Sequence, residues 1–111
     1  MRIVNRYLAL VRCRQPHVDW TKTLPNSDVI ASLGEEPRAY LLAENPRDDL
    51  DLALAESWMR IFECELYAWH TDENAWPRAR TRELFEWFEV TLASTVEDLS
   101  PVELEVEEFD I

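Results

Sequence analysis

The chain has a single glycine, Gly34, among its 111 residues. Loops that cradle phosphate groups, such as Walker and dinucleotide-binding loops, need several glycines so that the backbone can approach the phosphates closely. The sequence therefore excludes those classes of nucleotide-binding protein. It has just two cysteines, Cys13 and Cys64. We expect both to be reduced thiols that pack as small hydrophobic side chains.

Long apolar runs are also missing near the N-terminus, where the longest has five residues, Tyr7 to Val11. A secretory signal needs a longer apolar core, and a membrane-spanning helix needs about 20 apolar residues. We therefore predict a cytoplasmic protein of bacterial type with no membrane partner. Apolar residues make up 47% of the chain, which is enough to build a core without disulfides or a metal.

Positive charge is scarce and unevenly placed. The chain has 11 Lys and Arg residues against 23 Asp and Glu residues, which gives a net charge of −12. Residues 1–25 contain five cations and one carboxylate, hence +4, so residues 26–111 carry −16. A field of this sign repels nucleic acid and anionic lipid and attracts basic proteins. We therefore expect no nucleic-acid partner.

The clearest periodic pattern lies in residues 45–70. Apolar side chains recur there at three- and four-residue steps: Leu50, Leu54, Trp58, Ile61, Phe62, Leu66 and Trp69. This spacing places them along one face of an α-helix, which must be buried against the rest of the chain. Asn45 is a suitable cap and Pro46 suits the first helical position. The pattern predicts a helix over residues 46–70 that serves as a scaffold.

Shorter patterns fill the remainder of the chain. Strand signals occur in four places: residues 2–14, 38–44, 88–96 and 102–108. Helix signals occur in two more: residues 26–34 and 77–88. Residues 15–25 contain two prolines and are predicted as a loop. Residues 88–96 also fit a helical stripe, but their β-branched content favours a strand.

These elements predict one α+β domain, residues 1–111, in the order βαβααββ. Two layers satisfy the apolar faces of a sheet and a helix, because each layer buries the other. We expect a four-stranded sheet that is mostly antiparallel through a C-terminal hairpin of residues 88–96 and 102–108. One face of this sheet would pack on the long helix, and the other would be partly open.

The candidate metal ligands are His70, Asp72 and Glu73, with Cys64 nearby in the sequence. Imidazole, carboxylate and thiolate groups are all competent ligands. Their spacing matches neither the HExxH pattern nor paired CxxC motifs. A solvated helix end is the more common origin of such a group, so we expect no metal or cofactor. Cys13 and His17 are a second possible catalytic couple, in which the imidazole would activate the thiol.

Two tryptophans, Trp76 and Trp87, lie outside the helical stripe, and Arg78 is close to the first of them. Tryptophan and arginine are enriched among the residues that dominate the binding energy of protein interfaces. We therefore predict that Trp76, Arg78 and Trp87 contribute to a partner-binding surface.

The C-terminal residues 97–111 are the most distinctive surface, because they contain seven acidic residues and no basic residue. Glu103, Glu105 and Glu107 alternate with Val102, Leu104 and Val106. Such a segment is either a solvated edge strand or a docking face for a basic partner.

The sequence therefore predicts a non-enzymatic protein-binding module, of inhibitor, immunity or regulatory type, that recognises a basic protein partner. The predicted partner-binding residues are Trp76, Arg78, Trp87, Glu103, Glu105 and Glu107. The alternative is a small metal-dependent or thiol enzyme that uses His70, Asp72, Glu73 and Cys64. The chain is expected to be a monomer or a homodimer built on the open face of the sheet.

Overall fold

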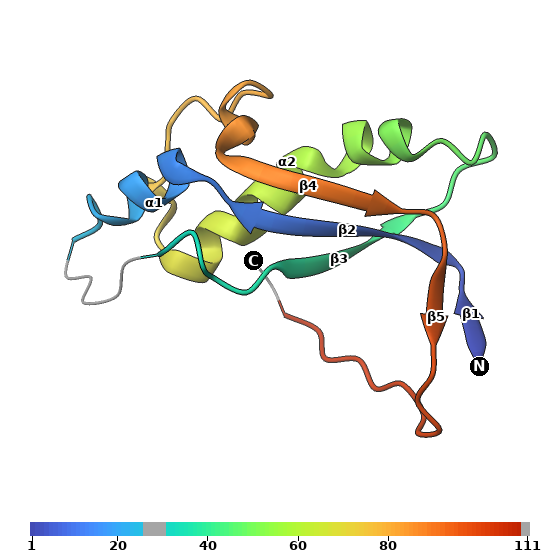
Figure 1. Cartoon of the computed structure of the whole chain (residues 1–111). Helices are drawn as coiled ribbons and strands as arrows, with labels where there is room; N and C mark the ends of the chain where they lie inside the picture. The colour runs from blue at the N-terminus through green and yellow to red at the C-terminus, as the bar shows by residue number, and fades with distance from the viewer. Residues whose placement is uncertain (26–30, 110–111) are drawn as a thin grey trace.

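The computed structural model of the chain describes residues 1–25 and 31–109. These residues form an α+β fold with two antiparallel sheets. Strands β2 (Arg6–Cys13), β3 (Arg38–Ala43) and β4 (Phe88–Ala93) make a three-stranded sheet in the order β3-β2-β4 (Figure 1). Strands β1 (Arg2–Val4) and β5 (Val96–Asp98) form a separate two-stranded arm.

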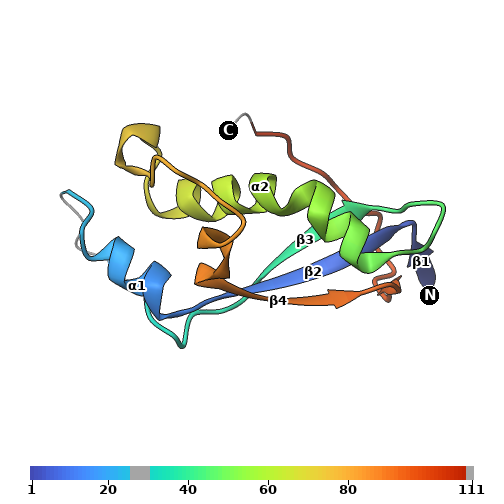
Figure 2. The same cartoon turned by 90° about the horizontal axis from the view of Figure 1, so that it is seen from above.

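Helix α2 (Leu50–Trp69) covers one face of the three-stranded sheet (Figure 2). Its periodic apolar pattern is confirmed, because Ile61, Phe62 and Leu66 are at most 2% exposed. The predicted start was wrong: the N-cap is Asp49, whose side chain accepts a hydrogen bond from the Leu52 N–H at 3.1 Å. The Asn45 side chain instead accepts hydrogen bonds from backbone N–H groups in the turn before the helix.

Strand β2 is the centre of the core. Tyr7, Ala9 and Val11 alternate along it and are at most 1% exposed, because a strand turns every second side chain to the same face. The Tyr7 hydroxyl donates to Asp48 Oδ1 at 2.8 Å, which ties the start of β2 to the turn before α2.

One end of the sheet is covered by short helical segments. Helix α1 spans Gln15–Thr21, and two 3₁₀ turns, η1 and η2, span Glu73–Ala75 and Leu84–Trp87. The loop prediction for residues 15–25 was therefore wrong over its first half, because a proline in the first turn is compatible with a helix. The predicted helix 77–88 is reduced to η2. Arginines in its expected first turn oppose the helix dipole.

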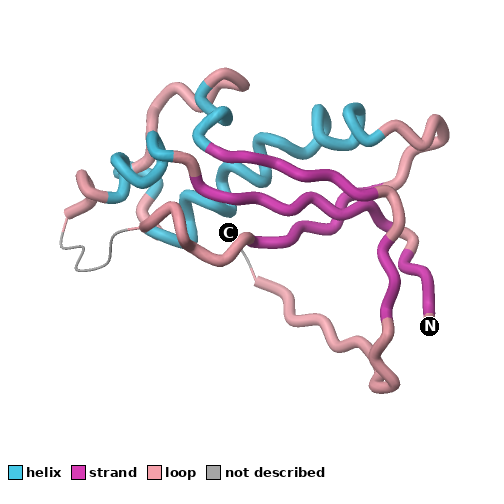
Figure 3. The backbone as a smooth tube through the Cα atoms, in the orientation of Figure 1, coloured by secondary structure: helices cyan, strands magenta, loops and turns pink. Residues whose placement is uncertain are grey.

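The predicted C-terminal hairpin was also wrong. The chain leaves the sheet after Ala93, and β5 pairs with β1 in the register Arg2↔Asp98 and Val4↔Val96. Residues 99–109 form no helix or strand (Figure 3). The four-stranded sheet is therefore replaced by a three-stranded sheet and a separate arm. The predicted helix 26–34 lies largely outside the described residues.

Within the described ranges, no helix has the length and apolar character needed to cross a membrane.

Candidate functional site

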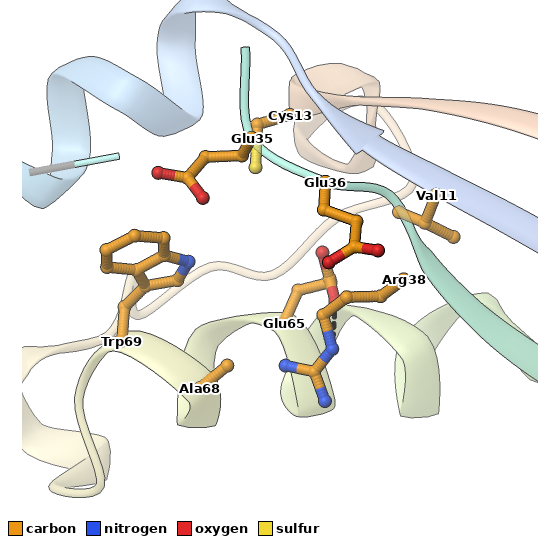
Figure 4. A pocket seen from close by; sticks show the side chains of 8 residues that line it. All are labelled: Val11, Cys13, Glu35, Glu36, Arg38, Glu65, Ala68 and Trp69. Carbon is orange, nitrogen blue, oxygen red and sulfur yellow. Dashed lines mark ion pairs between the residues drawn. The ribbon is translucent and has the colours of Figure 1, made fainter. Parts of the chain in front are cut away.

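A pocket of about 260 Å³ lies between the C-terminal half of α2 and the chain that leads into β3 (Figure 4). It is lined by Val11, Cys13, Glu35, Glu36, Arg38, Glu65, Ala68 and Trp69. The lining combines three carboxylates, one guanidinium, one thiol and one indole ring. These groups come from β2, from the segment before and into β3, and from α2.

Glu65 is the most buried polar group of the pocket, with 3% of its surface exposed. Its carboxylate accepts a short hydrogen bond from the Tyr40 hydroxyl, and the Arg38 Nε lies 3.4 Å from its Oε2. Burial raises the pKa of Glu65, while the Tyr40 hydrogen bond and the Arg38 charge oppose that rise. Burial, followed by the charge of Glu65, raises the pKa of Tyr40, so the phenol keeps its proton and acts as the donor.

Cys13 also lines the pocket, and its surroundings disfavour the thiolate. Burial, together with the charges of Glu65 and Glu35, raises the pKa of this thiol to about 11. A thiol is far less nucleophilic than a thiolate, and reactive cysteines have lowered pKa values. The pocket therefore lacks the electropositive surroundings that a cysteine enzyme needs at this position.

The charges of the pocket favour a cationic group. The Glu36 and Glu65 carboxylates lie close to the single cation of the pocket, Arg38, and the Glu35 carboxylate points towards the ring of Trp69 (Figure 4). Carboxylates attract cations, and the face of an indole ring does so as well. Glu65 is not among the site residues predicted from the sequence. The available signal was an acidic residue that falls within the apolar stripe of the long helix.

The residues predicted as candidate metal ligands lie at the C-terminal end of α2 and the start of η1, where two of them cap these elements. His70 is the C-cap, and its Nδ1 accepts a hydrogen bond from the Asp72 N–H at 3.1 Å. Asp72 in turn caps η1 by accepting from the Asn74 N–H at 3.0 Å. Burial raises the pKa of the Cys64 thiol. Among residues 1–25 and 31–109, no three His, Cys, Asp or Glu side chains are arranged to hold a metal ion.

His17 is fully buried in a cluster of aromatic rings. Its ring centroid lies 4.8 Å from that of Phe88 and 5.5 Å from that of Trp20, and the rings of Trp69 and Trp87 lie slightly farther away. Neither ring nitrogen has a hydrogen-bond partner among the described residues. Burial lowers the pKa of His17 to about 4, so the ring is neutral at pH 7.

The two tryptophans outside the stripe also pack inside the molecule. Trp76 is 6% exposed, and its indole N–H donates to the His70 carbonyl at 2.8 Å. The guanidinium of Arg80 lies over its ring at 5.6 Å. Trp87 is half-buried against Trp20. Packing accounts for both residues, and their contribution to a partner interface stays a prediction, as does that of the exposed Arg78.

The C-terminal tail, residues 99–109, has the opposite character, because every one of these residues is exposed. Leu104 is 68% exposed, and Val106 is 76% exposed. Arg2 fixes the start of the tail: it pairs with Asp98 at 2.8 Å and with Glu103 at 3.8 Å. Within the described part of the chain, the backbone of residues 104–109 makes no hydrogen bond.

Comparisons of the chain with protein-family models, with curated proteins and with solved structures find no match.

Proposed function

We propose that this chain is a non-enzymatic, cytoplasmic protein-binding module of inhibitor, immunity or regulatory type, and that its partner is a basic protein. The observation that carries the proposal is the C-terminal tail. It presents Glu103, Glu105, Glu107 and Glu108 on an extended and fully exposed backbone. The sequence from residue 97 to residue 111 contains no cation, and the only ion pair of these four glutamates among the described residues joins Glu103 to Arg2 at 3.8 Å.

An acidic segment of this kind acts on association in two ways. Its charge accelerates the encounter with a basic surface, and this effect weakens as salt screens the charges. Its exposed apolar residues then supply contact area once the two proteins meet. The net charge of −12 adds to the steering, because the whole chain attracts the same class of partner.

The pocket around Glu65 supports the same class of partner. Three carboxylates against one guanidinium suit a lysine or arginine side chain better than an acidic one. The raised pKa of Cys13 argues against the alternative of a thiol enzyme at this pocket.

The test compares two triple variants of the full chain. One variant, Glu103→Gln with Glu105→Gln and Glu107→Gln, neutralises the tail. The matched control neutralises three exposed acids elsewhere: Glu56, Glu73 and Glu83. Proteins that bind the wild-type chain in a bacterial lysate are recovered, identified and purified, and their dissociation constants are measured at low and high salt.

We expect the recovered partner to be basic and its binding to weaken with salt. The tail variant should raise the dissociation constant about tenfold, since each charge at the rim of an interface contributes modestly. The control should change it less than about twofold, because long-range charge alone contributes little. A partner that binds both triple variants as tightly as the wild-type chain would contradict the proposal.

A further inference from the structure

The outer edge of β3 is open. In the described part of the chain, β3 pairs with β2 along one edge and with no strand along the other. An unpaired edge presents a row of backbone N–H and C=O groups that can pair with another strand. On the sheet face away from α2, Ala39, Leu41 and Ala43 are all exposed, and Leu41 is 53% exposed.

The C-terminal tail has the sequence pattern of a β-strand but no neighbouring strand, among the described residues, to pair with. Leu104 and Val106 alternate with Glu105 and Glu107, which is the period of a strand with one apolar and one charged face. The backbone donors and acceptors of residues 104–109 are unpaired within the described residues. Exposure of this backbone and of the apolar side chains of Leu104, Val106 and Phe109 to water gives the isolated molecule no stability.

The side chains of the exposed face favour the edge of β3 over that of β4. On β3 this face carries Ala39, Leu41 and Ala43, which are apolar and exposed. A strand added to this edge can place Leu104 and Val106 beside Leu41 and turn its glutamates to the opposite face. The corresponding face of β4 carries the polar side chains Glu89 and Thr91, which offer less apolar surface to such a strand.

The first part of the tail is held on the β1–β5 arm. Arg2 binds Asp98, donates to the Val102 carbonyl at 3.4 Å and pairs with Glu103. These contacts fix the first part of the tail to the β1–β5 arm, which points away from the three-stranded sheet (Figure 1). Beyond the arm, the tail turns back on the β3 side of the molecule (Figures 1 and 2) and pairs with no strand of the described residues, so its backbone is free to pair with a second molecule.

We propose that residues 104–109 of one copy add as a fourth strand to the free edge of β3 in a second copy. The exchange is reciprocal, because a closed two-fold dimer uses the same tail and the same edge on both copies. Main-chain hydrogen bonds supply the attraction, and the alternating side chains set which face the strand presents. The inference does not rest on a basic partner, although that partner and the second copy compete for one tail.

The test measures self-association of the full chain by sedimentation equilibrium, from low micromolar to submillimolar concentration. The salt concentration is about 0.15 M, where the screening length of roughly 8 Å suppresses repulsion between two acidic copies. Leu104→Pro and Glu105→Pro are tested separately, because alternate residues of a strand turn their N–H groups to the edge. Leu104→Val is the matched control, since it keeps an apolar side chain and the N–H group.

We expect a monomer–dimer equilibrium for the wild-type chain. At least one proline variant should raise the dissociation constant of the dimer about tenfold or more, because it leaves an edge group unpaired. The valine control should stay within about threefold, since valine also suits a strand. Hydrogen exchange should show that the amides of both the tail and β3 become protected as the dimer forms.

Three results would overturn the inference. The first is a wild-type chain that remains monomeric with unprotected tail amides. The second is a monomer whose tail amides are protected, which would mean that the tail closes on its own chain. The third is a dimer that neither proline weakens. These measurements contain no basic partner, so they fail or succeed independently of the proposed function.

Discussion

Replacing His17 with leucine should make the stability of the protein less dependent on pH. The imidazole is fully buried among four aromatic side chains, and neither nitrogen has a partner among the described residues. Leucine fills a similar volume and has no polar atoms. At pH 7, where the ring is neutral, we expect the free energy of unfolding to change by no more than about 1 kcal/mol.

His17 changes the free energy of unfolding when the pH is lowered, and the sign of this change follows from the lowered pKa of its imidazole. Burial lowers the pKa of His17 from 6.5 to about 4. The folded state therefore favours the neutral ring, and this contribution is complete above pH 6.5 and is lost as the pH falls towards 4. Each unit of pKa difference corresponds to about 1.4 kcal/mol, so the loss approaches roughly 3 kcal/mol near pH 4.

Glu65 contributes with the opposite sign. Its pKa is raised by burial, so its protonated form favours the folded state, and stability from this group increases as the pH falls through its folded-state pKa. Both proteins contain Glu65, so its contribution cancels when the variant is subtracted from the wild-type chain. The difference between the two curves therefore isolates His17.

Urea unfolding followed by tryptophan fluorescence measures both stabilities between pH 4 and pH 7.5. We expect His17→Leu to become more stable than the wild-type chain by roughly 3 kcal/mol as the pH approaches 4. His70→Gln is the control, because it removes a histidine and leaves the aromatic cluster intact. If the difference between wild type and His17→Leu is the same at every pH, the account of a desolvated imidazole is wrong.

Two further changes test the packing. Tyr40→Phe removes the hydroxyl that donates to the buried Glu65 carboxylate. This change should lower the free energy of unfolding by about 1–3 kcal/mol at pH 7. Equal urea midpoints for the variant and the wild-type chain would contradict this expectation. Phe62→Ala empties a fully buried site that contacts Phe85 and Phe88 and should cost about 3–5 kcal/mol. Calorimetry checks this change, and a melting temperature close to that of the wild-type chain would show that the core collapses around the gap.

Elements with local signals could be predicted from the sequence. Helix α2 was found because its apolar residues repeat over many turns, and β3 was found as a short apolar run with ends close to the observed ones. These patterns record which face of an element is buried. They do not record which element covers it, because that choice depends on residues far apart in the chain.

The β1–β5 arm was not predicted, because it pairs two segments that are far apart in the sequence. The sequence predicts one strand over residues 2–14, but the chain breaks at Asn5, and the first part pairs with β5 more than 90 residues later. The pairing includes the Arg2–Asp98 contact, which no local period encodes. The pocket was missed for the same reason, since its lining comes from three segments and is recognisable in the sequence only through Glu65.

The failed hairpin prediction and the proposed dimer have one physical origin. The alternation of Leu104 and Val106 with glutamates is typical of a strand, but a strand is stable only when another strand pairs with it. In this chain Asp98 accepts a hydrogen bond from the Ser100 N–H, and Pro101 follows, so the backbone turns away before the pattern begins. Arg2 then holds that turn on the arm. The amphipathic segment is thus intact, and within the described residues it pairs with no strand of its own molecule.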